Sequence, residues 1–395
     1  MRRNIAALLL AIAVVSLPAC SSSGGTKVAI VGVVAPLDKG LVQFGRGIRN
    51  SVQVAVDQAN SEKPLPGWKF QLKAVDDSSD PSTGEAAARR LAADSNVVGV
   101  VGTYNSGVAA KVAPVLQGAG IVMISPGNTD PTLTVGSDPA HPTRQYSNYF
   151  RMVASDAVQG PFLAKTAFGD LHARRGAVVS ETKPVSKGLA DTFAADFASQ
   201  GGAVVLRQVV PDETTDFKDV ASAIAGAHPD LVFFGGEYQV GAQFAKQVSE
   251  AGVTAPVMGG DGIKDDAYIA KAGAASEGDV ASTVGQPFAA VPSARPFLDA
   301  YAQAKFADAP TDFGVYAYDA ANLVIAGAAK VLRGADTVTA EARRGIVAFV
   351  QAADVKGASG TAAFDALGDP RDKVLTLYRV SGGAWKAIKT EGSTP

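Results

Sequence analysis

The chain has 395 residues, of which 36 are basic and 38 acidic, so its formal net charge is −2. The net charge is thus close to zero, and the sequence contains no basic stripe. Both observations argue against nucleic acid as a partner. A single cysteine excludes an internal disulfide framework, and the length suffices for two domains.

The N-terminal segment has the pattern of a secretory signal peptide. Two arginines precede an apolar run over residues 5–17, and Cys20 follows a Leu-Pro-Ala sequence. A basic start, a short apolar stretch and a small residue before the cut are typical of such signals. The run is shorter than the roughly 20 residues of a membrane span. We expect residues 1–19 to be removed, which changes the formal charge from −2 to −4, and residues 20–26 to form a flexible tether.

From residue 27 the chain alternates between strand and helix patterns. Residues 28–34 form a continuous apolar, β-branched run, as expected for a strand buried on both faces. Residues 45–60 have helical spacing with one apolar side. The same criteria predict further strands at 70–75, 97–101 and 121–125 and helices at 82–95 and 107–117.

The alternation starts again after Arg151. It predicts helices at 156–168, 187–199, 217–227 and 240–251 and strands at 176–180, 203–209, 231–235 and 256–259. An extended segment at 279–284 precedes expected helices at 293–306, 316–333 and 340–352. Two final strands, 374–380 and 384–389, are joined by a Ser-Gly-Gly sequence that is typical of a hairpin.

Strands that alternate with helices indicate βαβ units and parallel sheets. We therefore expect an α/β fold with two Rossmann-like lobes, in which the chain returns to the first lobe after building the second. The predicted first lobe comprises residues 27–152 and 283–355. The predicted second lobe comprises residues 153–282 and 356–395.

Common signatures of catalysis and of metal binding are absent from the sequence. Its three histidines, His141, His172 and His228, lie far apart, so a histidine-based metal site has no support. No P-loop, dinucleotide fingerprint or nucleophile elbow occurs. We expect no catalytic residue, no cofactor and no metal. Because carboxylates without a motif can also catalyse, an extracellular enzyme stays open as the least favoured alternative.

Polar and glycine-rich segments follow several of the predicted strands, at 103–106, 125–129, 235–238 and 259–262. In open parallel sheets, ligands bind outside the carboxyl ends of the strands. Ser106 opens a predicted helix, whose N-terminus favours an anion such as a carboxylate. Asp261 is suited to a cation. Each residue alone is also explained as a helix cap or a turn, but together they match a zwitterion.

In this order the segments resemble the branched-chain amino-acid-binding proteins of ABC transporters, which have the type I periplasmic binding-protein fold. The resemblance extends over residues 27–395. It rests on the segments 28–36, 44–45, 76–81, 101–106, 123–129, 187–190, 233–236 and 257–262. The Leu-x-Ala-Cys sequence before residue 21 resembles the lipobox of bacterial lipoproteins, in which the cysteine is acylated. An ordinary signal peptide with a chance cysteine is the alternative.

The resemblance implies a role for each matching residue. Ser106 would bind the amino-acid carboxylate, and Thr129 would contact both ends of the amino acid. Gly127 would offer its backbone carbonyl to the ligand ammonium, which Asp261 would face with its carboxylate. The expected contacts also include Phe44 and Tyr104.

The predicted side-chain pocket departs from the family pattern. Val185 and Ser186 replace a tyrosine followed by glycine, and Glu237 replaces a common aromatic residue, with Tyr238 beside it. An unpaired Glu237 near an apolar ligand would be costly. Two interpretations remain open: Glu237 meets a polar or basic ligand side chain, or it points to solvent while Tyr238 forms the wall.

The resemblance implies a solute-binding lipoprotein on the outer face of the bacterial cytoplasmic membrane, held there by lipid on Cys20. It would capture an amino acid between two lobes, joined by a multi-strand hinge, and deliver it to an ABC transporter permease. The main alternative is a tethered ligand sensor with the same fold and no role in transport.

Overall fold

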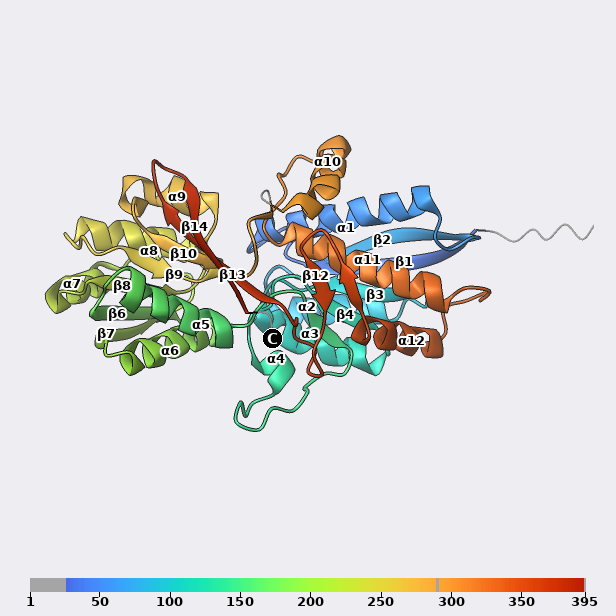
Figure 1. Ribbon diagram of the computed structural model, residues 1–395, viewed down its shortest axis with the longest axis horizontal. Coiled ribbons are helices and arrows are strands. Elements are labelled where there is room, and N and C mark those ends of the chain that lie inside the picture. Colours follow the sequence, from blue (N-terminus) through green and yellow to red (C-terminus); the bar gives the residue numbers. More distant parts are fainter. Residues whose placement is uncertain (1–25, 289–290, 394–395) are drawn as a thin grey trace, which may run out of the picture.

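A computed structural model describes residues 26–288 and 291–393. These residues form two α/β lobes that lie side by side along the long axis of the molecule (Figure 1). Each lobe is built around its own sheet, with helices packed against it. The predicted α/β class with parallel sheets in two lobes is therefore confirmed.

The first lobe contains a parallel sheet with the strand order β2-β1-β3-β4-β5. Its strands are β1 (Lys27–Ala35), β2 (Trp68–Asp76), β3 (Val97–Gly102), β4 (Val122–Ser125) and β5 (Tyr149–Arg151). Its helices are α1 (Val42–Glu62), α2 (Pro81–Ala92), α3 (Ser106–Gly118), α4 (Thr132–Val135), α10 (Arg295–Ala304), α11 (Gly314–Val331) and α12 (Ala340–Gln351). A separate hairpin consists of β11 (Asp354–Lys356) and β12 (Thr361–Ala363).

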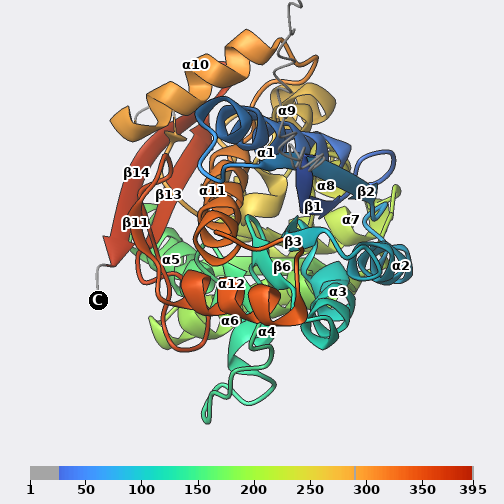
Figure 2. The ribbon, with the colours of Figure 1, turned by 90° about the vertical axis from the view of Figure 1, so that its right-hand side faces the viewer.

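Alternation along β1 explains why helices cover both faces of this sheet. Ala29, Val31 and Val33 belong to the core that includes α1 and α11. Ile30 and Val34 belong to the core that includes α2 and α3. Figure 2 shows the same division, with α1 and α11 on one side of the sheet and α2 and α3 on the other. A strand buried in this way needs the continuous apolar run that the sequence has there.

The second lobe contains a mixed sheet with the strand order β14-β13-β10-β9-β8-β6-β7. Its strands are β6 (Arg175–Glu181), β7 (Ala203–Val210), β8 (Leu231–Gly235), β9 (Val257–Gly259), β10 (Val280–Thr283), β13 (Lys373–Val380) and β14 (Trp385–Ser393). Its helices are α5 (Asp156–Lys165), α6 (Pro184–Ser199), α7 (Lys218–Ala227), α8 (Tyr238–Glu250) and α9 (Asp266–Ala272). The strands β13 and β14 pair antiparallel, which confirms the predicted hairpin.

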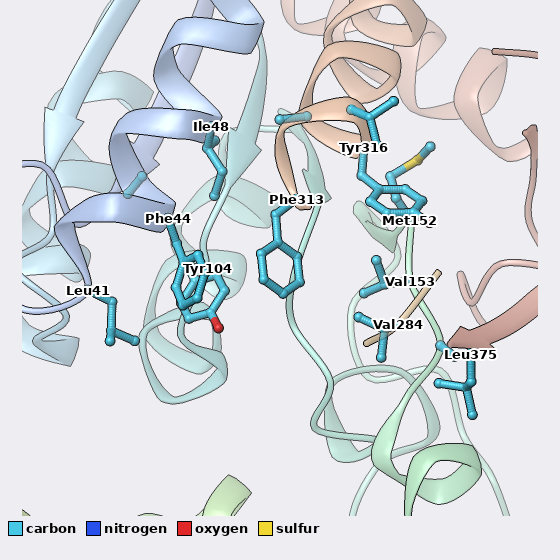
Figure 3. Close-up of a cluster of buried hydrophobic side chains, with 14 of the residues drawn as sticks. Leu41, Phe44, Ile48, Tyr104, Met152, Val153, Val284, Phe313, Tyr316 and Leu375 are labelled. Atoms are coloured by element: carbon cyan, nitrogen blue, oxygen red, sulfur yellow. The ribbon is translucent and has the colours of Figure 1, made fainter. Parts of the chain in front are cut away.

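The lobes are joined where the chain leaves β5, where it leaves β10 and where it enters β13. Figure 3 shows residues of these segments near Tyr316 of α11, with Met152 beside its ring and Val153, Val284 and Leu375 below it. All of these side chains are buried. The crossing segments therefore form one apolar junction between the lobes.

The hairpin β11–β12 packs on the first lobe. The backbone N–H of Ser359 donates to Asp319 of α11 at 2.7 Å, and Arg151 of β5 donates to Asp369 at 2.6 Å. We therefore propose that residues 356–372 belong to the first lobe, which would move the last predicted lobe boundary from residue 356 to the start of β13.

Candidate ligand-binding site between the lobes

A pocket of about 60 Å³ lies between the lobes, at the carboxyl ends of strands from both sheets. First-lobe loops after β3 and β4 form one side. The other side consists of the starts of α5 and α6 and the loops after β8 and β9, as expected for a ligand site in parallel sheets. The lining residues are Tyr104, Asn105, Ser106, Gly127, Thr129, Asp156, Val185, Ser186, Leu189, Gly236, Glu237, Asp261 and Gly262.

Ser106 connects the two first-lobe loops. Its Oγ accepts hydrogen bonds from the backbone N–H groups of Thr129 at 3.2 Å and Asp130 at 3.3 Å. The N-cap residue of α3, Asn105, makes no side-chain cap within the described part of the chain: its Nδ2 donates to Glu237, and its Oδ1 accepts no hydrogen bond there. Backbone N–H groups in the first turn of α3 therefore stay available for an anion.

An aromatic cluster supports the same loops. Phe44 stacks on Tyr104 with ring centroids 4.5 Å apart and meets Phe313 edge-on at 5.3 Å. Figure 3 shows the three rings next to one another. Gly127 fits between two of these rings, since a Cβ there would lie 3.0 Å from Tyr104 and 3.2 Å from Phe313. Phe44 also meets Tyr238 of the second lobe edge-on at 5.8 Å. Aromatic contact thus joins the lobes beside the pocket.

Two buried carboxyl groups in the pocket share one glutamine. Gln159 Nε2 donates to Asp156 Oδ1 and to Asp261 Oδ1, both at 2.9 Å. Gln159 Oε1 accepts from the backbone N–H of Asp261 at 2.9 Å. Thr129 Oγ1 donates to Asp156 Oδ2 at 3.1 Å. A continuous hydrogen-bond chain therefore runs from the first-lobe loop after β4 to the second-lobe loop after β9.

Both carboxyl groups resist ionisation. Burial, with a smaller contribution from the charge of Asp261, raises the pKa of Asp156 to about 8. Burial likewise raises the pKa of Asp261 to about 6. Desolvation penalises the charged form until an opposite charge comes close. The site is therefore suited to a ligand that brings a cation to the two carboxyl groups.

Glu237 has partners from both lobes. Its Oε2 accepts from Lys183 Nζ at 2.6 Å, and its Oε1 accepts from Asn105 Nδ2 at 2.9 Å. The side chain is 15% exposed. Neither sequence-based interpretation included a partner for Glu237 within the protein, and the structure adds one, because the Lys183 ammonium pairs with its carboxylate.

Comparison with known proteins agrees with this two-lobed layout. A family model described as periplasmic binding protein matches residues 30–384. The chain belongs to this family. The binding protein is 29% identical over 353 residues to a Leu/Ile/Val-binding protein of Rhizobium johnstonii, and the match covers 89% of this chain and 92% of the relative. Members of the family bind solutes, so this binding protein is not an enzyme.

Solved structures show the same fold. The branched-chain amino acid transporter substrate-binding protein of Streptococcus pneumoniae in complex with isoleucine has a TM-score of 0.80 and 24% identity, covering 93% of this chain and 100% of that one. An ABC transporter solute-binding protein of R. palustris in complex with benzoate has a TM-score of 0.77 and 21% identity. The match covers 92% of this chain and 96% of that one. Since these two neighbours hold different ligands, the fold alone does not identify what this binding protein takes.

Most of the predicted ligand-contacting residues of the binding protein come together in the pocket. Phe44 and Tyr238 do not line it and instead form the aromatic contact beside it. Cys20 lies outside the described residues. The predicted residues that line the pocket are Tyr104, Ser106, Gly127, Thr129, Val185, Glu237 and Asp261.

Sequence reasoning missed Asp156, Gln159 and Lys183. Asp156 is the first residue of α5, where an acidic side chain is ordinarily explained by the helix dipole. Lys183 follows the carboxyl end of β6. The strand-end rule that predicted the other loops would have included residues 181–186 as well.

Within residues 26–288 and 291–393, no helix is long and apolar enough to cross a bilayer. The same residues contain no cluster of three or more side chains suited to holding a metal ion.

Proposed function

We propose that this binding protein captures an α-amino acid between its lobes and delivers it to the permease of an ABC transporter. The proposal rests on the division of charge in the pocket, with anion-binding donors on the first lobe and buried carboxyl groups on the second. An α-amino acid presents a carboxylate and an ammonium group to match. The relative named Leu/Ile/Val-binding protein and the isoleucine-bound neighbour support this class of ligand.

The ligand carboxylate would lie against the first lobe. The first turn of α3 offers backbone N–H groups and the Ser106 hydroxyl, and Thr129 offers its own hydroxyl nearby. Hydrogen bonds to a charged group are shorter and stronger than those between neutral groups. They would also fix the orientation of the ligand before the lobes close.

The ligand ammonium would lie at the carboxyl groups of Asp156 and Asp261. These groups are joined through Gln159, so both are held in place before a ligand arrives. Gly127 also lines the pocket, and its backbone carbonyl would be a third acceptor. Because Asp261 comes from the second lobe, its contact would form only when the lobes are together, and ligand binding would favour the closed form.

The location of the binding protein is part of the proposal. Lipid on Cys20, such as a palmitoyl chain, would hold it on the outer face of the cytoplasmic membrane within reach of a permease. Cys20→Ser should release the protein into the soluble fraction or leave its signal peptide uncleaved. Unchanged membrane association and processing of this variant would contradict the anchor and leave the binding site unaffected.

A thermal-shift screen of amino acids, followed by calorimetry, tests the proposed ligand class. We expect at least one L-amino acid to raise the unfolding temperature, and we expect Ser106→Ala to weaken its binding by about 10-fold or more. Ser199→Ala, at the exposed end of α6, is the matched control and should bind normally. Stabilisation by benzoate but by no amino acid would overturn the proposal.

A further inference from the structure

The second-lobe wall of the pocket contains an internal charge cluster. Lys183 Nζ lies 2.6 Å from Glu237 Oε2 and 3.9 Å from Glu181 Oε2. Glu181 Oε2 also accepts from the backbone N–H of Glu237 at 3.1 Å. One lysine ammonium therefore serves two carboxyl groups, and one of them, Glu237, lines the pocket.

Burial makes the charges in this cluster depend on one another. The Glu181 side chain is fully buried, its Oε1 has no hydrogen-bond partner among the described residues, and burial raises its pKa to about 7. Burial alone would lower the pKa of Lys183, but the nearby charges of Glu237 and Glu181 outweigh it and raise that pKa. Lys183 thus stays protonated and is held where its ammonium neutralises the carboxylate of Glu237 on the pocket wall.

We propose that Lys183 sets the charge selectivity of the pocket: as the internal counterion of Glu237, it restricts the ligand to α-amino acids with uncharged side chains. The inference rests on the proposed amino-acid function. It gives Glu237 a role that neither sequence-based interpretation included.

Each class of charged side chain meets an obstacle at this wall. A basic side chain would have to displace Lys183 from Glu237 or place a second cation beside it, and like charges at such distances repel. An acidic side chain would face the carboxylate of Glu237 without a free cation in the cluster. An uncharged side chain meets the apolar surface of Val185 and Leu189 and leaves the ion pair intact.

Lys183→Met tests the inference, because methionine keeps an unbranched stem and removes the ammonium. Without it, Glu237 lacks a cation, and a basic ligand side chain can take the vacant place. Calorimetry should show that the affinity ratio of leucine to lysine falls by at least about 10-fold from wild type to variant. Lys183→Met with Glu237→Gln removes both charges and should restore the preference for leucine.

Lys187→Met is the matched control, since Lys187 lies near the start of α6, for which Lys183 is the N-cap residue, and pairs with half-exposed Asp191. It should leave the ratio unchanged. A leucine-to-lysine ratio that is the same in Lys183→Met and wild type overturns the inference, provided that thermal unfolding shows both to be folded. If Lys183→Met is unfolded, the variant that also carries Glu237→Gln tests the inference. Equal affinity of this double variant for leucine and lysine would contradict the inference, because a wall without the ion pair should still prefer leucine. Failure of the wild type to bind any amino acid would instead refute the proposed function.

Discussion

Asp261 and Asp156 are buried carboxyl groups whose side-chain partners in the protein are neutral hydrogen-bond donors. Their contacts are the amide of Gln159 and the hydroxyl of Thr129. Burial raises the pKa values of both groups, and the hydrogen bonds from these donors lower them only in part, because a neutral donor does not cancel the charge. At the scale of single residues, two buried carboxyl groups without a cationic partner therefore favour a ligand group that carries a positive charge.

Asp261→Ala should weaken amino-acid binding by about 30-fold or more, because truncation of one partner of a buried charge pair costs roughly 2–5 kcal/mol. Calorimetry measures the affinity, and circular dichroism checks that the fold is intact. Asp266→Asn, on the neighbouring helix α9, should bind like the wild type. Equal affinity of Asp261→Ala and wild type would show that the ammonium site is misplaced.

Ligand binding should release protons at neutral pH. In the free protein Asp156, with a pKa of about 8, is mostly protonated at pH 7, and Asp261, with a pKa of about 6, is partly so. A ligand ammonium favours the ionised form, so protons leave on binding and affinity rises between about pH 5 and about pH 8.

Titrations in buffers with different ionisation enthalpies count the protons released. Asp156→Asn should reduce this number at pH 7, since it removes the group with the higher pKa. Proton uptake, or an affinity that falls as the pH rises over this range, would contradict the assigned charges.

At the scale of elements, Arg151 of β5 holds the pocket-lining loop after β4. Its guanidinium is fully buried and donates to Asp369 at 2.6 Å, to the backbone carbonyls of Asn128 and Asp130 at 3.0 and 2.9 Å, and to Thr134 at 2.6 Å. One side chain thus fixes the loop that includes the pocket-lining residues Gly127 and Thr129.

Arg151→Met should lower the free energy of unfolding by about 3–5 kcal/mol, because it leaves Asp369 buried without its partner. Denaturant unfolding measures the loss, and adding Asp369→Asn should recover part of it. Arg295→Ala breaks an exposed pair with Asp299 and should cost no more than about 1 kcal/mol. A loss that small for Arg151→Met would show that the loop does not depend on this anchor.

The sequence predicted the long elements because their patterns are local. The uniform apolar run of β1 and the single apolar side of α1 each identify an element without reference to its neighbours. The short β5, the hairpin β11–β12 and helix α9 have too few residues for such a period. Their positions depend on tertiary contacts, such as the bond between Ser359 and Asp319, which no local pattern encodes.

The same distinction applies to the site. Ser106 and Asp261 follow glycine-rich strand ends and could be predicted one loop at a time. The link between Asp156 and Asp261 spans more than 100 residues of sequence and depends on Gln159 reaching both. The pairing of Glu237 with Lys183 is likewise invisible until β6 and β8 are placed side by side.

At the scale of the whole molecule, contacts outside the pocket also join the lobes. Lys264, after β9, lies 2.7 Å from Asp312, just before α11, with side-chain exposures of 17% and 23%. Gln239 Nε2 donates to the backbone carbonyl of Gly40 at 3.0 Å. These contacts favour the closed arrangement without touching the pocket residues.

Asp312→Asn should shift the lobes toward an open arrangement and weaken ligand binding a few-fold, because affinity falls with the fraction of binding-competent molecules. Small-angle scattering of the ligand-free variant should give a larger radius of gyration than the wild type. Lys264→Met should have the same effect, and the double variant should add little, since both changes break one pair. Fully additive effects would show that the two residues act independently.

The most direct test of amino-acid capture is one calorimetric series with the amino acid that the thermal-shift screen selects. Two analogues are titrated beside it, one without the amino group and one without the carboxylate. Since the pocket offers partners to both the carboxylate and the ammonium group, we expect each analogue to bind at least about 100-fold more weakly than the amino acid itself. Equal affinity for the analogue that lacks the amino group would contradict the account, because Asp156 and Asp261 would then not be receiving a cation.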